Sequence, residues 1–114
     1  MPHARACPTA YAPRADVVAD AERIAAETGG SVTLYIDPNE AAVGSDVIVT
    51  DTWVSMGKEE EKAARLRDLG PYKVTTETMG LAASDAIFIH CLPADRGYEV
   101  DAEVIDGPQS VVWD

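Results

Sequence analysis

The sequence is poor in cysteine, aromatic residues and positive charge, and it has no long hydrophobic run. Its two cysteines, Cys7 and Cys91, are too few for the disulfide framework of a small secreted domain. Neither belongs to a cluster with zinc-ligand spacing, so we expect free thiols and no metal. No apolar stretch approaches the ~20 residues that cross a bilayer, and the N-terminus lacks a signal-peptide core. We therefore expect a cytoplasmic protein without a membrane span.

Basic residues are scarce: 20 acidic side chains face 9 basic ones, a formal net charge of -11. Nucleic-acid binding needs a positive surface that displaces counterions from phosphates, so we expect no nucleic-acid partner. The same balance disfavours an anionic membrane surface. The simplest interpretation of the excess acid is a well-solvated surface.

The 114 residues suffice for one modest domain in which strands and helices alternate. Apolar residues at helical spacing precede Gly29-Gly30, and acidic residues at 59–61 precede basic ones, as a helix dipole prefers. The pattern predicts helices over 14–28, 59–69 and 76–83, shorter helical turns after Asp37 and within 98–106, and strands over 4–7, 31–36, 46–50, 86–90 and 110–113. We expect the strand 46–50, DVIVT, to be covered on both faces.

This alternation predicts an α/β fold with a doubly wound, Rossmann-like parallel sheet. Such sheets bind ligands beyond the carboxyl ends of their strands. Two segments follow strands in this way, DTWVSMG at 51–57 and HCLPADRG at 90–97. Carboxyl ends of parallel strands share one edge, so we expect both segments to face the same ligand.

The segment after the strand 86–90 places an imidazole beside a thiol. Neighbours on an extended chain point to opposite faces, which argues against His90 activating Cys91 as a nucleophile. Taken alone, each is more often structural, Cys91 as a small buried hydrophobe. Leu92-Pro93 ends the strand and leaves carbonyl oxygens that no ladder uses, free to accept hydrogen bonds from a ligand.

The segment after the strand 46–50 offers a carboxylate, a hydroxyl and a glycine. Asp51 there is suited to hold a ligand's ammonium group, Ser55 adds a hydroxyl, and Gly57 permits close backbone approach. Alternatively, Asp51 and Ser55 cap the helix that follows. The residue types alone leave these two interpretations about equal.

The two segments, taken with their surroundings, resemble the ornithine carbamoyltransferases. The similarity extends through TAYAPRADV, DPNEAAVGSDVIVTDTWVSMG, ASDAIFIHCLPADRG and SVVWD. It implies transfer of a carbamoyl group from carbamoyl phosphate to the side-chain amine of L-ornithine, in arginine biosynthesis, by a trimer-based homo-oligomer without a cofactor. Residues 1–114 would be one incomplete domain, part of the C-terminal ornithine-binding domain.

The same resemblance assigns roles to individual residues. It implies that Asp51, Ser55 and Met56 hold the amino-acid end of ornithine, and that Cys91 accepts a proton from the attacking amine. The resemblance also implies that the backbone of Cys91 and Leu92 contacts carbamoyl phosphate and that the Leu92-Pro93 bond is cis. The resemblance leaves His90 and Pro93 a supporting role.

Parts of the family pattern are missing, and other functions stay open. The carbamoyl-phosphate domain with its Ser-Thr-Arg-Thr-Arg loop is absent, as is the Gly-Asp-Gly-Asn-Asn strand that would fill the middle of the sheet, so we expect the isolated chain to be inactive. One alternative is a non-catalytic α/β binding or oligomerisation module, and another is a carbamoyltransferase for putrescine or aspartate. A dinucleotide-binding domain is disfavoured because no Gly-x-Gly-x-x-Gly follows a strand.

Overall fold

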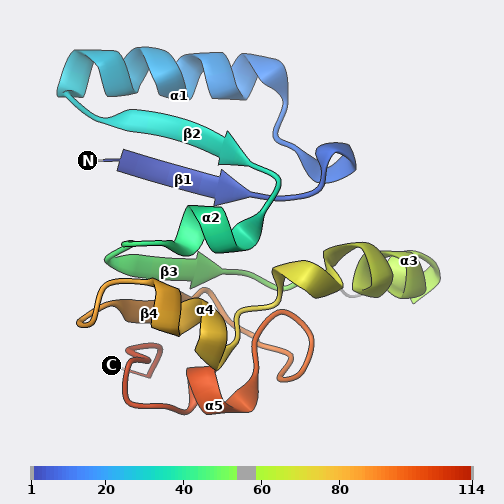
Figure 1. Ribbon diagram of the computed structural model, residues 1–114. Helices are drawn as coiled ribbons and strands as arrows, with labels where there is room; N and C mark the ends of the chain where they lie inside the picture. The colour runs from blue at the N-terminus through green and yellow to red at the C-terminus, as the bar shows by residue number, and fades with distance from the viewer. Residues whose placement is uncertain (1, 54–58, 114) are drawn as a thin grey trace. The chain divides into compact units, whose positions relative to one another are not determined.

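The computed structural model describes residues 2–53 and 59–113, which form two compact units, residues 1–41 and 42–114 (Figure 1). We call them unit 1 and unit 2. Ser55, Met56 and Gly57 lie outside the described residues. No helix in the described part of the chain is both long and apolar enough to cross a membrane.

Unit 1 is a pair of parallel strands with one long helix. It contains β1 (Pro2–Ala6), the 3-10 turn η1 (Thr9–Tyr11), α1 (Ala15–Thr28) and β2 (Ser31–Tyr35). The strands pair in parallel from Pro2↔Ser31 to Ala6↔Tyr35, and α1 lies along β2 (Figure 1). No side chain among residues 2–41 is fully buried, so this unit has no core of its own.

Local sequence signals set the ends of the elements in unit 1. Gly29 ends α1 in the left-handed conformation at φ 80°, and the N–H groups of Gly29 and Gly30 both donate to the Ala25 carbonyl. Asp37 Oδ1 accepts the Asn39 N–H at 2.9 Å at the start of α2 (Pro38–Ala42), so Asp37 caps the helical turn that the sequence predicts after it.

Unit 2 carries the core and a second parallel pair. Its elements are β3 (Val47–Thr50), α3 (Glu59–Leu69), the 3-10 turn η2 (Gly70–Tyr72), α4 (Thr76–Leu81), β4 (Ile87–His90) and α5 (Ala102–Ile105). Strands β3 and β4 pair from Val47↔Ile87 to Thr50↔His90. The core side chains are Val74, Met79, Phe88, Val100, Val104 and Ile105. They lie on α4, β4, α5 and the segments that join them, and they fix β4 behind the candidate site.

The structure confirms the predicted α/β class with parallel strands, but some details differ. The described strands form two two-stranded ladders, β1–β2 and β3–β4. Strand β3 is not covered on both faces: Ile48 packs against the core, whereas Val47 and Val49 are 38% and 58% exposed. The alternation of a strand turns these two residues to the face opposite the core of unit 2.

The predicted last strand, residues 110–113, is wrong. Ser110 makes a single isolated bridge to Phe88, framed by hydrogen bonds from Phe88 N–H to Gln109 O and from Val111 N–H to Phe88 O. The chain then turns, and Val112 N–H donates to Ser110 Oγ at 3.4 Å. The side-chain hydroxyl thus competes with strand pairing, as is common for serine.

Candidate functional site

The structure brings the two predicted segments together at one edge of unit 2. Because β3 and β4 are parallel and Thr50 pairs with His90, Asp51 and Cys91 are the first residues beyond neighbouring strand ends (Figure 1). We call residues 51–53 the DTW turn and residues 90–97 the HCLP turn. Thr52 Oγ1 donates to the Pro93 carbonyl at 2.6 Å and joins the two turns directly.

Asp51 in the DTW turn is exposed, and its carboxylate accepts the Thr52 N–H at 2.7 Å. Thr52 and Trp53, the residues that would open a helix capped by Asp51, are not helical, so Asp51 is not the N-cap of α3 (Glu59–Leu69). That alternative is therefore wrong for Asp51. The turn is also held by α3, because Arg65 Nη1 donates to the Trp53 carbonyl at 3.1 Å. The exposed carboxylate is thus available to a ligand on a fixed backbone.

Backbone geometry turns the HCLP segment out of the ladder. The Leu92-Pro93 bond is cis, as the resemblance implied, and Leu92 has φ 59°. Cys91 is exposed and Leu92 is 37% exposed. The interpretation of Cys91 as a small buried hydrophobe is therefore wrong. The Pro93 carbonyl, expected to be free for a ligand, is instead used by Thr52.

His90 points the other way, into unit 2, where its side chain is fully buried. Its Nδ1 accepts the Leu92 N–H at 2.8 Å, and its Nε2 lies 2.8 Å from Glu99 Oε1. A backbone N–H can only donate, so Nδ1 carries no proton and the neutral ring donates from Nε2 to Glu99. Glu99 Oε1 also accepts the Asp95 N–H at 2.9 Å. One buried carboxylate thus holds the first residue of the HCLP turn and the backbone of Asp95.

These contacts give His90 a structural role. Both ring nitrogens are engaged, so the imidazole does not activate the Cys91 thiol, and the argument against a His-Cys nucleophile gains direct support. Glu99 Oε2 is buried and has no hydrogen-bond partner among the described residues. Sequence reasoning missed Glu99, because an acidic residue in YEVDAEVID looks like one side of a solvated helix. A glutamate between two apolar residues, Tyr98 and Val100, was the only available signal.

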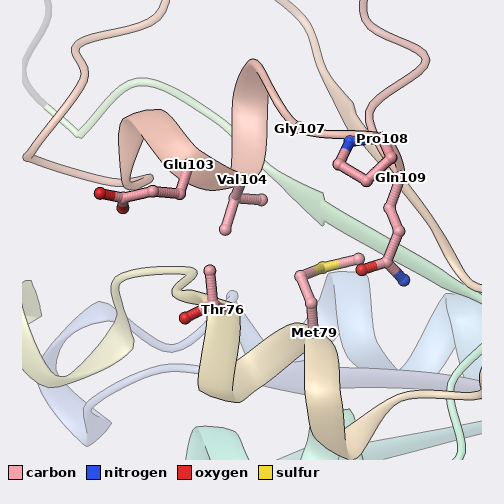
Figure 2. Close-up of a pocket in the computed structure, with 7 residues that line it drawn as sticks. All are labelled: Thr76, Met79, Glu103, Val104, Gly107, Pro108 and Gln109. Atoms are coloured by element: carbon pink, nitrogen blue, oxygen red, sulfur yellow. The ribbon is translucent and has the colours of Figure 1, made fainter.

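A separate cavity of about 240 Å³ lies between α4 and α5 (Figure 2). Met79 and Val104 supply apolar surface from the two helices, and Glu103 projects at its rim. The other lining residues are Thr76, Gly107, Pro108 and Gln109. Among the described residues, Asp51, Cys91 and Leu92 do not line this cavity, so the candidate site remains the shared edge of the two turns.

Parallel strands that alternate with helices, with polar side chains beyond their carboxyl ends, are typical of Rossmann-like α/β ligand-binding domains. Residues 3–114 match the family model described as aspartate/ornithine carbamoyltransferase, Asp/Orn binding domain. The chain belongs to the aspartate/ornithine carbamoyltransferase family.

Individual relatives are also similar to this chain. The ornithine carbamoyltransferase of Clavibacter sepedonicus is 72% identical over 109 residues, which cover 96% of this chain and 36% of the relative. Among solved structures, ornithine carbamoyltransferase from Pyrococcus furiosus has a TM-score of 0.90 at 46% identity, covering 96% of this chain and 35% of that one. Ornithine transcarbamoylase from Giardia lamblia has a TM-score of 0.88 at 37% identity, covering 99% and 36%. The chain therefore spans about a third of these relatives.

Proposed function

We propose that this chain supplies the ornithine-binding part of an ornithine carbamoyltransferase. The reaction transfers the carbamoyl group of carbamoyl phosphate to the side-chain amine of L-ornithine and gives L-citrulline and phosphate. The observation that supports it most is the placement of Asp51 and Cys91 beyond paired ends of β3 and β4, in turns joined by the hydrogen bond between Thr52 and Pro93.

The roles within this site follow from the chemistry of each group. The Asp51 carboxylate suits the ammonium of ornithine's amino-acid end, with Ser55 and Met56 proposed beside it. Leu92 donates its N–H to His90, so we propose that its carbonyl oxygen accepts from the amino group of carbamoyl phosphate, with the Cys91 backbone as a second contact. His90 and Pro93 support the site by fixing this backbone.

The proposed reaction requires that the attacking amine lose a proton. The amine of ornithine resembles that of lysine, which titrates near 10.4, so neutralising it at pH 7 costs roughly 4–5 kcal/mol. A thiolate with the ordinary cysteine value of about 8.5 accepts that proton at an uphill cost of roughly 2–3 kcal/mol, to which the cost of ionising the thiol is added. Cys91 is exposed at the site edge, and we assign it this proton relay without a covalent intermediate.

The complete enzyme extends beyond these residues in this proposal. The phosphate-binding half of the site belongs to the part of the relatives' length that this chain does not span. We further propose that the complete enzyme is a cytoplasmic, trimer-based homo-oligomer of arginine biosynthesis. L-ornithine and carbamoyl phosphate are its only partners in the reaction.

A chimaeric enzyme tests this function with the chain's own residues. Residues 3–114 replace the corresponding segment of the Clavibacter sepedonicus enzyme, which is 72% identical to this chain over 109 residues. We expect the chimaera to form citrulline from ornithine and carbamoyl phosphate at a rate comparable with its parent. The 114-residue chain alone should form none, because it lacks the phosphate-binding half. Colorimetric citrulline measurement checks both.

The same assay separates the alternatives. A folded chimaera that makes no citrulline would contradict the proposal and favour a non-catalytic module. Calorimetric titration of the 114-residue chain with ornithine then distinguishes a binding module from one that binds nothing. Greater turnover with putrescine or aspartate than with ornithine would reassign the acceptor.

Asp51→Asn in the chimaera should raise the KM for ornithine by about 10- to 150-fold. This range corresponds to the roughly 1.5–3 kcal/mol of a hydrogen bond to a charged group, at tenfold per 1.4 kcal/mol. Asp51 is exposed and does not cap α3, so stability should hardly change. The matched control is Asp85→Asn, an exposed aspartate just before β4. An unchanged KM in Asp51→Asn would remove Asp51 from the site.

A further inference from the structure

The HCLP turn carries an arginine for which the proposed chemistry has no use. Arg96 Nε donates to Asp106 Oδ2 and Arg96 Nη2 to Asp106 Oδ1, both at 2.8 Å. The guanidinium also lies 5.9 Å from the centre of the Trp113 ring. Asp106 is the residue that ends α5. Arg96 therefore joins the HCLP turn to the end of α5 and to the segment after it.

The geometry separates this pair from an ordinary surface ion pair. Exposed pairs contribute little on average, and two parallel hydrogen bonds from one guanidinium to one carboxylate are the exception. The hydrogen bond to Asp106 raises the pKa of Arg96, and the same bond lowers the pKa of Asp106. Because the folded-state pKa of Asp106 lies below its unfolded value, the pair stabilises the fold above about pH 4 and loses this effect as the pH falls through the lower value. The ammonium group of lysine cannot form these two parallel hydrogen bonds to one carboxylate.

Arg96 holds the outer side of the HCLP turn, where the other anchors do not reach. Thr52 fixes the Pro93 carbonyl, and the buried Glu99 fixes the Asp95 N–H. Both act on the side that faces β3 and the core. Beyond them the turn closes through the Gly97 N–H, which donates to the Val100 carbonyl at 2.7 Å. A second backbone hydrogen bond, from the Tyr98 N–H to the Asp95 carbonyl at 3.0 Å, also closes the turn. Arg96 adds the side-chain contact that ties the exposed side of the turn to the end of α5.

We propose that Arg96 and Asp106 are positioning residues that hold the HCLP turn, with Cys91 and Leu92 at its start, in the geometry that carbamoyl transfer needs. This inference rests on the proposed function. Neither side chain touches the reacting atoms in this proposal; both act through the backbone of the turn. A displacement of about 1 Å at a reacting centre can cost about 10²-fold in rate. Loss of a single outer anchor should therefore lower turnover measurably without unfolding the protein.

Variants of the chimaeric enzyme test the inference. Arg96→Lys and Asp106→Asn should each lower kcat/KM for carbamoyl phosphate by about tenfold, with the KM for ornithine within twofold of the parent. The charge-exchanged double variant Arg96→Asp with Asp106→Arg should recover part of the loss. Arg67→Lys is the control, an exposed arginine with a single 3.3 Å contact to Asp68, and should be unchanged.

The outcomes are distinguishable from failure of the proposed function. A parent chimaera without activity contradicts the function itself, whereas an active parent with Arg96→Lys and Asp106→Asn both within twofold overturns the positioning role. A loss that only tracks the unfolded fraction also overturns it, which unfolding curves at the assay temperature reveal. Amide exchange in the 114-residue chain gives an activity-free readout. Arg96→Lys should speed exchange at Gly97 about tenfold and leave Met79 in α4 unchanged, and equal exchange at Gly97 would contradict the anchor.

Discussion

Cys91→Ser in the chimaeric enzyme should lower kcat by about 10²- to 10⁴-fold, the usual contribution of a general acid–base group. Serine keeps the size of the side chain, but its hydroxyl ionises far less readily than a thiol, so the attacking amine loses its proton acceptor. Cys91 is exposed, and the substitution should therefore change stability by no more than about 0.5 kcal/mol. Steady-state citrulline formation measures the effect.

The pH profile distinguishes a proton relay from a general disturbance of the site. As the pH rises toward the amine's own value of about 10.4, solvent removes the proton and the deficit of Cys91→Ser should shrink. Cys7→Ser is the matched control, because Cys7 is the other free cysteine and lies outside the site turns. It should stay within twofold of the parent. Full turnover of Cys91→Ser at pH 7 would rule out the relay.

Glu99→Ala should destabilise unit 2 by about 2–5 kcal/mol, because each buried or partly buried donor that loses its acceptor costs about 1–3 kcal/mol. The substitution leaves the buried His90 Nε2–H and the partly buried Asp95 N–H without their acceptor. Glu99→Gln keeps one acceptor oxygen but places an amide nitrogen where Oε2 has no partner. We therefore expect Glu99→Gln to lower the free energy of unfolding by about 1–3 kcal/mol. Urea unfolding of the 114-residue chain measures both.

Tryptophan fluorescence makes this measurement specific to unit 2, because Trp53 and Trp113 are the two tryptophans of the chain. The control is Glu103→Ala on α5, which removes an exposed carboxylate and should change the free energy of unfolding by no more than about 0.5 kcal/mol. A Glu99→Ala midpoint equal to that of Glu103→Ala would mean that the buried pair contributes nothing to stability.

Local signals predicted much of the fold from the sequence. The helix over 59–69 has the predicted bounds, and Gly29 and Asp37 mark the ends of elements by their own backbone and side-chain preferences. The opposite directions of His90 and Cys91 follow from strand alternation alone, and the structure shows one buried and the other exposed. Such features depend on residues within a few positions of each other.

Features that depend on distant partners were not predicted. The burial of Glu99 requires an imidazole nine residues earlier in the chain, and no periodicity encodes that pairing. The Pro93 carbonyl meets Thr52 across 41 residues, so its availability to a ligand was overestimated. Residues 110–113 have the composition of a strand, but the pairing stops after Ser110, which only the tertiary structure reveals.

Adjacent residues of the HCLP turn should respond differently in a mutational screen that measures protein abundance and catalytic activity separately. A substitution at His90 removes a buried hydrogen-bonded ring and should reduce how much folded protein accumulates. A conservative substitution at the next residue, Cys91, should leave the amount of folded protein unchanged and remove most of its catalytic activity. A screen that scored growth alone would rank the two positions as equivalent.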